Sequence, residues 1–428
     1  VSIVFQQSHS QYRFLENRTP LPTGEDTGFL LDSPTRIKID LSGEWGYKIT
    51  GGPAGTVNLP AAADFVGEVT FERSFEVNPD DFGKYQFHVV CLGANYNCGI
   101  WINNDFITNH VGGYTSFVAP IPDNVLQIGK ENVIRVVTDN RLDVTRTIPI
   151  RHGVGGWRNY GGVYRHIYIL GTPRIFISDV VASTELKADR SLAKVKVYPT
   201  LEGGTRADTA ARRFQMYAEV YEKLSGTLVA GSSQVPVRWQ EDGWSVPAIE
   251  CTLPSPKLWD LSSPNLYSVR TYLVDAATKT VIDEYRLTIG VRKLEIADDR
   301  VVLNGVVQPL YGVVWYEDHE AYGSALPATQ MEKDVILVKS LGATAIRFAH
   351  HPPHPYMLDL CNRYGLLALE ELPVHRVPAR TLSQEHFLEL GLMRLKEMIV
   401  RDRNHPCVFA WGLGDEFETS DSLTRRFV

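Results

Sequence analysis

The chain has 428 residues, of which 44% are hydrophobic and 22% charged, an ordinary globular composition and a length that suggests roughly two to four domains. The net charge of −7 gives no basic surface for nucleic acid or an anionic membrane. No apolar run approaches the ~18 residues needed to cross a bilayer, and the sequence does not indicate a cellular compartment.

Residues 1–170 are predicted to be all-β. Short alternating or β-branched runs recur between Gly, Asn, Asp and Pro, as in residues 69–77, 86–92 and 132–137. A spacing near ten residues per strand is typical of a sandwich or jelly roll. Aromatic residues beside glycines, at Gly112–Tyr114 and Gly155–Gly162, could stack on sugar faces. For each segment taken alone, a tight loop with core-packing aromatics is the favoured interpretation.

Residues 171–289 form a second predicted β region. Runs with period-two alternation, such as residues 194–199, 214–221 and 267–273, are separated by polar turns. This length and strand number favour an immunoglobulin-like sandwich, although no Cys–Trp–Cys pattern is present. No catalytic constellation is found here, so we expect this region to act as spacing and support.

Residues 290–428 show a different periodicity. Strand-like runs at 310–315, 343–349, 366–369 and 408–411 alternate with helical patterns, among them one that Ser383 is expected to cap. This βαβαβαβ order indicates a parallel sheet. No GxGxxG phosphate loop follows a strand, so we favour the first half of a (β/α)8 TIM barrel over a doubly wound sheet.

Each of these strands ends in ionisable residues. Glu317 and Asp318 follow the first strand, Arg347 and His350 the second, Glu370 and Glu371 the third, and Asp415 and Glu416 the fourth. Parallel strands present their carboxyl ends at one edge, where α/β barrels carry their chemistry. A surface acidic turn explains Asp415–Glu416 alone, but not four strands that end alike.

The motifs together resemble glycoside hydrolase family 2, the β-galactosidase and β-glucuronidase group. The most specific matches are Arg347–Pro352 (RFAHHP) and Arg403–Trp411 (RNHPCVFAW). Further matches are Leu41–Trp45, Trp101–Asn104, His110–Tyr114, Asn159–Gly162, Lys257–Tyr267 and Gly290–Arg292. The resemblance implies a jelly-roll sugar-binding domain at 1–170, an immunoglobulin-like domain at 171–289 and the start of the catalytic barrel at 290–428.

By this resemblance Glu416 is the general acid/base of a retaining exo-β-glycosidase. Arg347 and His350 match positions that line the sugar subsite, and Glu371 matches an acidic position that supports it. Asp415 stands where the family usually has an Asn that contacts the sugar 2-hydroxyl, so like-charge repulsion could alter the pKa of Glu416. Tyr316 falls within the altered end of the first barrel strand and is included among the substrate-binding candidates.

The resemblance also places the nucleophilic Glu on a later barrel strand, beyond residue 428. A retaining glycosidase needs two carboxyl groups about 5 Å apart. We therefore expect a chain truncated within its catalytic barrel, inactive or nearly so alone. β-Galactosides are the default substrate, and a non-catalytic carbohydrate-binding protein is the alternative.

Metal ions and cofactors are not predicted. The five cysteines form neither a disulfide framework nor, with histidines, a structural zinc pattern. Prolines separate His350, His351 and His354 from any helical register. The expected partner is a carbohydrate, with homo-oligomers common among relatives.

Overall fold

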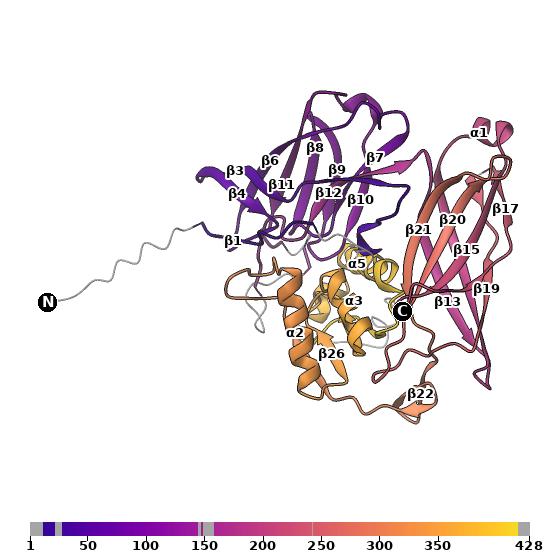
Figure 1. Ribbon diagram of the computed structural model, residues 1–428. Coiled ribbons are helices and arrows are strands. Elements are labelled where there is room, and N and C mark those ends of the chain that lie inside the picture. Colours follow the sequence, from indigo (N-terminus) through magenta and orange to yellow (C-terminus); the bar gives the residue numbers. More distant parts are fainter. Residues whose placement is uncertain (1–11, 22–27, 144–146, 149–157, 242, 418–428) are drawn as a thin grey trace.

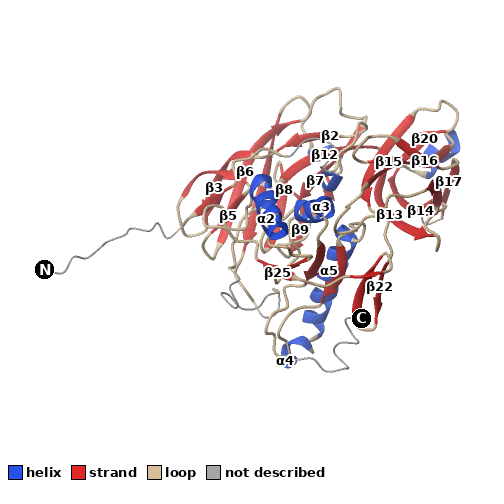
Figure 2. Cartoon of the chain, turned by 60° about the horizontal axis from the view of Figure 1, so that its bottom comes forward, coloured by secondary structure: helices blue, strands red, loops and turns tan. Residues whose placement is uncertain are grey.

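The computed structural model describes residues 12–21, 28–143, 147–148, 158–241 and 243–417. Two β regions precede a C-terminal part that contains most of the helices (Figures 1 and 2). In Figure 1 the first β region, in indigo and purple, lies above the orange and yellow helices, and the second lies beside them. Gly155 and Gly156 of the glycine-rich segment fall outside the described residues.

The named strands of the first β region pair antiparallel to one another. A six-stranded sheet in the order β4-β3-β6-β11-β8-β9 shares one core with a four-stranded sheet in the order β10-β7-β12-β2, and β1 pairs with β5. In β11, Ile134 and Val136 are fully buried on one face, the period-two pattern that the sequence predicted. The strands are β1 (Phe14–Glu16), β2 (Ile37–Asp40), β3 (Gly43–Ile49), β4 (Ala54–Leu59), β5 (Ala61–Ala63), β6 (Glu68–Glu76), β7 (Tyr85–Cys91), β8 (Asn97–Ile102), β9 (Asp105–Val111), β10 (Phe117–Pro120), β11 (Glu131–Asp139) and β12 (Ile167–Pro173), with 3-10 turns at Gly28–Leu30 and Asp123–Val125.

The second β region encloses a core of its own between two sheets. A three-stranded sheet has the order β13-β14-β19, and a larger sheet has the order β18-β17-β15-β20-β21, with β16 paired to β15. Its elements are β13 (Ile175–Leu186), β14 (Leu192–Gly203), α1 (Arg206–Ala211), β15 (Phe214–Glu222), β16 (Leu228–Gly231), β17 (Val235–Gln240), β18 (Gly243–Ser245), β19 (Ile249–Pro254), β20 (Tyr267–Asp275) and β21 (Val281–Ile289).

The C-terminal part, which we call the βα part, holds a four-stranded parallel sheet in the order β25-β26-β27-β28. Its elements are β25 (Gly312–Trp315), α2 (Ala328–Ser340), β26 (Ala345–Phe348), α3 (Pro355–Tyr364), β27 (Leu367–Glu371), α4 (Ala379–Leu382), α5 (Glu385–Asp402) and β28 (Val408–Gly412). A small antiparallel sheet of β22 (Leu294–Ala297), β23 (Arg300–Leu303) and β24 (Val306–Val307) precedes it. The parallel βα order predicted from the sequence is therefore present.

Helix α3 shows how the sequence sets these boundaries. Pro355 occupies the first turn, and the His354 side chain accepts a hydrogen bond from the Tyr356 amide at 3.1 Å. Gly365 ends the helix with φ of 68°, and a Cβ atom there would lie 2.6 Å from the Leu261 carbonyl oxygen. Glycine is therefore required both by the left-handed turn and by the close approach of the neighbouring segment.

The expectation that Ser383 caps the long helix is wrong. The short helix α4 takes up Ser383 at its end, where the Ser383 amide bonds to the Ala379 carbonyl at 3.0 Å. Helix α5 begins after Gln384 instead. Within the described residues, no helix combines the length and apolar character needed to cross a bilayer.

Candidate functional site

The carboxyl ends of the four parallel strands carry the residues that the sequence singled out. Tyr316 follows β25, Arg347 lies in β26 with His350 just beyond it, and Glu371 ends β27. An isolated parallel bridge joins His375 to Asp415 beyond β27 and β28, so the ladder continues past the named strands. This extension holds the loops after the third and fourth strands together.

Arg347 is the centre of the cluster. Its Nε and Nη2 donate to the two carboxylate oxygens of Glu371 at 2.9 Å each, and Nη2 lies 3.2 Å from Asp415 Oδ2. The paired contact is the planar fork geometry in which arginine holds a carboxylate most firmly. The Glu371 side chain is 2% exposed and that of Arg347 31%, so the guanidinium reaches the surface from a buried anchor.

His350, just beyond the end of β26, also contacts Glu371. Its amide donates to Glu371 Oε1 at 2.6 Å, and its Nδ1 lies 3.2 Å from the same oxygen. Its φ of 66° is unusual for a residue other than glycine, a kind of strain often found at functional sites. The ring stands 5.6 Å from that of Tyr316, centroid to centroid.

His375 belongs to the same cluster, and the sequence analysis missed it. Its ring centroid is 4.2 Å from that of His350, and its Nδ1 is 3.4 Å from Asp415 Oδ2. Although the side chain is buried, neither ring nitrogen has a hydrogen-bond partner among the described residues. Burial, with the neighbouring His350, lowers the pKa of His375, which favours the neutral ring.

Asp415 faces the cluster. Burial would raise its pKa, but the hydrogen bond and charge of Arg347 outweigh burial, and the pKa of Asp415 is lowered. Asp415 therefore presents a carboxylate, where a family Asn would be neutral. The net charge of the cluster is accordingly more negative than an asparagine would leave it.

Glu416 is placed differently. Its carboxylate accepts a hydrogen bond from Arg376 Nε, and both side chains are about half exposed, at 54% and 52%. The Arg376 hydrogen bond lowers the pKa of Glu416. The structure thus brings together Tyr316, Arg347, His350, Glu371 and Asp415, with Glu416 at the rim in a contact of its own.

A metal ion could be held here by one group found among the described residues. Ligand atoms of His350, His375 and Asp415 lie within 4.8 Å of one another. The Arg347 guanidinium, 3.2 Å from Asp415 Oδ2, already supplies a positive charge to that carboxylate. Because this guanidinium would repel a metal cation, we derive no metal chemistry from His350, His375 and Asp415.

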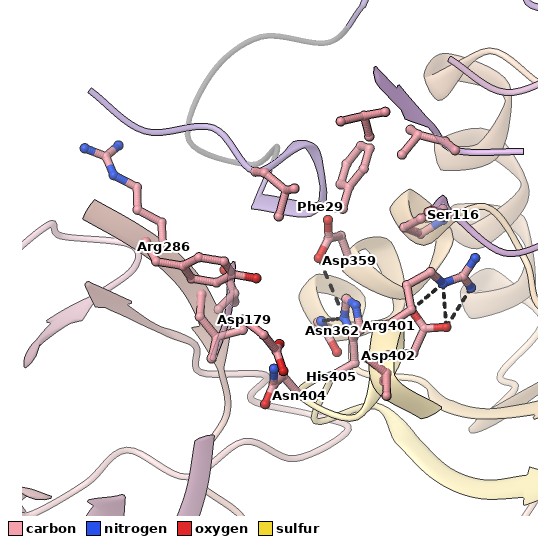
Figure 3. A pocket seen from close by; sticks show the side chains of 18 of the residues that line it. Phe29, Ser116, Asp179, Arg286, Asp359, Asn362, Arg401, Asp402, Asn404 and His405 are labelled. Atoms are coloured by element: carbon pink, nitrogen blue, oxygen red, sulfur yellow. Dashed lines mark hydrogen bonds and ion pairs between the residues drawn. The ribbon is translucent and has the colours of Figure 1, made fainter. Parts of the chain in front are cut away.

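A cavity of about 320 Å³ lies elsewhere, where the two β regions meet the βα part (Figure 3). The polar side chains at its βα side bond to one another: Asn362 lies 2.7 Å from His405 Nδ1, and Arg401 Nε is 2.8 Å from Asp402. These groups have satisfied contacts, unlike the ring nitrogens of His375. The strand-end cluster is therefore the better candidate for ligand binding.

A parallel sheet whose strand ends converge on a partly exposed arginine, buried histidines and carboxylate groups defines a barrel-type site for a polar small molecule. Family models agree with this class: "Glycosyl hydrolases family 2" matches residues 175–292 and "Glycosyl hydrolases family 2, TIM barrel domain" matches residues 294–425. The chain belongs to glycoside hydrolase family 2, as its motifs predicted. The β-rich multidomain fold with part of a TIM barrel is likewise confirmed.

Known proteins of this kind cover most of the chain. It is 29% identical to a β-galactosidase of Thermoanaerobacter pseudethanolicus over 80% of its length, and 28% identical to a β-glucuronidase of Bacteroides fragilis over 81%. The structure of a β-D-glucuronidase from Dictyoglomus thermophilum matches 92% of the chain with a TM-score of 0.78 at 26% identity, and the chain covers 70% of that protein. The chain spans only 44% and 50% of the two curated relatives, about half of their length.

Proposed function

We propose that this chain carries the sugar-binding and acid/base half of a retaining exo-β-glycosidase that hydrolyses terminal β-linked sugars. Support comes above all from the strand-end cluster, which contains a fixed guanidinium, a carboxylate and two histidines. Ring nitrogens of these histidines have no hydrogen-bond partner among the described residues. Sugar hydroxyls both donate and accept hydrogen bonds, so they can satisfy such nitrogens. Relatives named as β-galactosidases and β-glucuronidases support the same class of substrate.

The proposed roles follow the geometry. Arg347, His350, His375 and Asp415 would bind sugar hydroxyls, and Tyr316 would line the subsite beside His350. Glu371 would hold Arg347 and His350 in place. The first two regions would be a jelly-roll domain at 1–170 and an immunoglobulin-like domain at 171–289, followed by the barrel from 290.

Glu416 would protonate the glycosidic oxygen and then activate water. The contact with Arg376 favours the ionised carboxylate, so this contact has to be replaced before Glu416 can donate a proton. A bound β-glycoside, which brings its glycosidic oxygen to Glu416, could provide that replacement. By the family resemblance we expect the second carboxyl group of a retaining mechanism on a later barrel strand.

Substrate choice is proposed as a β-galactoside, with a β-glucuronide as the competing possibility that the relatives raise. Two lactone inhibitors distinguish the two sugars by calorimetry: galactonolactone and glucarolactone. We expect the chain to bind galactonolactone at least tenfold more tightly than glucarolactone; the opposite preference would favour the β-glucuronide. Equal affinity for both, or no binding at all, would contradict a sugar-selective subsite in this cluster.

Catalysis is tested with 4-nitrophenyl β-glycosides and the Glu416→Gln variant in the full-length gene product. The variant should lose at least ~100-fold in hydrolysis, because general acid–base catalysis contributes ~10²–10⁴-fold. Its lactone affinity should change little. Equal hydrolysis by variant and parent would refute the acid/base assignment, whereas sugar binding without turnover in either would favour a non-catalytic carbohydrate-binding protein.

A further inference from the structure

The first β region contacts the two strand ends that carry Tyr316 and His350. Glu317 and Asp318 follow Tyr316 directly, and His351 and Pro352 follow His350. Each of these four residues touches the first β region, whereas Tyr316 and His350 lie next to each other in the cluster. The segments that bear the proposed sugar-binding residues are thus held from their other side.

Arg165 makes the main contact. Its side chain is fully buried, and its guanidinium donates to Glu317 Oε2 at 2.6 Å, to the Pro352 carbonyl at 3.0 Å and to the Tyr114 carbonyl at 2.7 Å. One side chain of the first β region therefore bonds to the segments that follow both β25 and β26.

The neighbouring Gly93 and the buried Glu317 carboxylate fix the position of the Arg165 side chain. A Cβ atom on Gly93 would lie 2.7 Å from Arg165 Cδ, so only glycine leaves room for the side chain to pass. The Glu317 side chain is 1% exposed, and burial raises its pKa, an effect that the charge of Arg165 opposes. An arginine at this point keeps a buried carboxyl group paired.

Two further contacts act at the same strand ends. The Tyr160 hydroxyl donates to Asp318 Oδ1 at 2.7 Å. The Tyr114 ring stacks on His351 with centroids 4.2 Å apart and an interplanar angle of 9°. These contacts flank Arg165, so the first β region restrains residues 317–318 and 351–352 at several points.

We propose that Arg165 is a positioning residue for the sugar subsite, which sets the relative placement of Tyr316 and His350 from the first β region. This inference rests on the proposed function for its ligand, but not for its geometry. Displacements of about 1 Å can cost up to ~100-fold where groups must be held in place, so a remote anchor can govern affinity.

The chain offers a matched control. Arg36 is also buried and joins two regions: it bonds to Asp283 Oδ2 at 2.7 Å and to the Ile177 carbonyl at 2.6 Å, with side chains 2% and 0% exposed. It connects the first β region to the second, and among the described residues none of its hydrogen bonds reaches a strand end of the βα part. Loss of this arginine removes the same kind of buried pair without touching the proposed subsite.

The experiment compares Arg165→Met, Arg165→Lys and Arg165→Met/Glu317→Gln with Arg36→Met/Asp283→Asn in the full chain. Lactone affinity is measured by calorimetry and folding by the thermal midpoint. The double variant at Arg165 removes the unpaired charge and should recover much of the stability that Arg165→Met loses. Its lactone affinity should nevertheless stay at least tenfold below that of the parent, with Arg165→Lys between the two. The control double variant should bind the lactone within about twofold of the parent.

A second measurement separates this proposal from the proposed function. Imidazole resonances of His350 and His375 are assigned with His350→Gln and His375→Gln and followed by NMR without any sugar. They should shift in Arg165→Met and in Arg165→Met/Glu317→Gln, and stay in place in the Arg36→Met/Asp283→Asn control. Unchanged resonances in the double variant, or lactone affinity that returns together with its stability, would overturn the positioning role. Failure of the parent to bind any lactone would count against the sugar site alone.

Discussion

The two β regions contact the βα part at different places. The first meets the carboxyl ends of the strands, through Arg165 at Glu317 and Tyr160 at Asp318. The second meets the segment before β28, where Asn404 Nδ2 donates to the Val180 carbonyl at 2.8 Å and Arg403 pairs with Asp179. Ligands bind at the carboxyl ends of the strands in barrel folds. The first region can therefore influence the site directly, whereas the second stabilises the fold of the βα part away from the site.

The largest expected effect is on the free energy of unfolding, at the contact between the second region and the βα part. Trp259 is fully buried between the second region and α3, and its Nε1 donates to the Asn362 carbonyl at 2.8 Å. Trp259→Ala should lower the free energy of unfolding by about 3–5 kcal/mol, through a large cavity and an unpaired carbonyl. Chemical denaturation measures this loss. Trp239→Ala, at a partly exposed hairpin position, serves as control and should cost much less; a comparable loss would contradict the prediction.

At the site, Glu371→Gln should affect binding more than folding. The neutral amide cannot hold Arg347 by two charged hydrogen bonds, and hydrogen bonds to charged groups contribute about 1.5–3 kcal/mol each. Because Arg347 is partly exposed, we expect a loss of about 1–3 kcal/mol in unfolding free energy and at least tenfold in lactone affinity. Calorimetry and denaturation should be run side by side. Affinity equal to that of the parent would show that Arg347 needs no fixed anchor.

Glu370 precedes Glu371 on β27 but is fully buried, beside Asp402. Burial, reinforced by the Asp402 charge, raises the pKa of Glu370 well above its ordinary value. A carboxyl group with a raised folded pKa contributes full stability below its unfolded pKa of about 4.3, and this contribution is lost as pH rises through the folded pKa. Glu370→Gln mimics the protonated form and should remove that loss.

The difference in unfolding free energy between Glu370→Gln and the parent should therefore shift in favour of the variant by at least about 1 kcal/mol between pH 5 and pH 8. Thermal melts in a pH series provide the measurement. A constant difference across this range would mean that Glu370 keeps an ordinary pKa in the folded chain.

The smallest effect is expected at the second region's charged contact. The side chains of Arg403 and Asp179 are 23% and 35% exposed, so solvent screens the pair. Arg403→Gln should cost no more than about 1 kcal/mol and leave lactone affinity unchanged. A larger loss of affinity would show that the second region also controls the site, and would remove the contrast between the two regions.

Local sequence patterns predicted much of this molecule. Pro355 and Gly365 bound α3 as expected, and the common direction of the parallel strands brought Arg347, His350, Glu371 and Asp415 together. Patterns of this kind depend on neighbours within a few residues, or on one rule of sheet geometry. The placement of Ser383 failed because a short preceding helix, α4, took up that residue.

Other features depend on contacts between distant parts of the sequence. His375 lies in an irregular loop after β27, where no periodicity marks a side chain as pointing toward the cluster. Arg165 bonds to a glutamate 152 positions away, and an isolated arginine in a glycine-rich segment gives no sign of that partner. The assignment of catalytic and binding roles to the site residues stays a prediction until the variants are measured.

The bridge between His375 and Asp415 has a practical consequence for exchanging parts among relatives. The Asp415 amide donates to the Val374 carbonyl at 2.7 Å, and the Arg376 amide donates to the Asp415 carbonyl at 3.1 Å. Main-chain hydrogen bonds therefore join residues 372–378 and 413–417 into a single structural unit. To transfer a new specificity into this scaffold, both segments would have to be exchanged together. Either segment alone would lose the main-chain hydrogen bonds that fix its conformation.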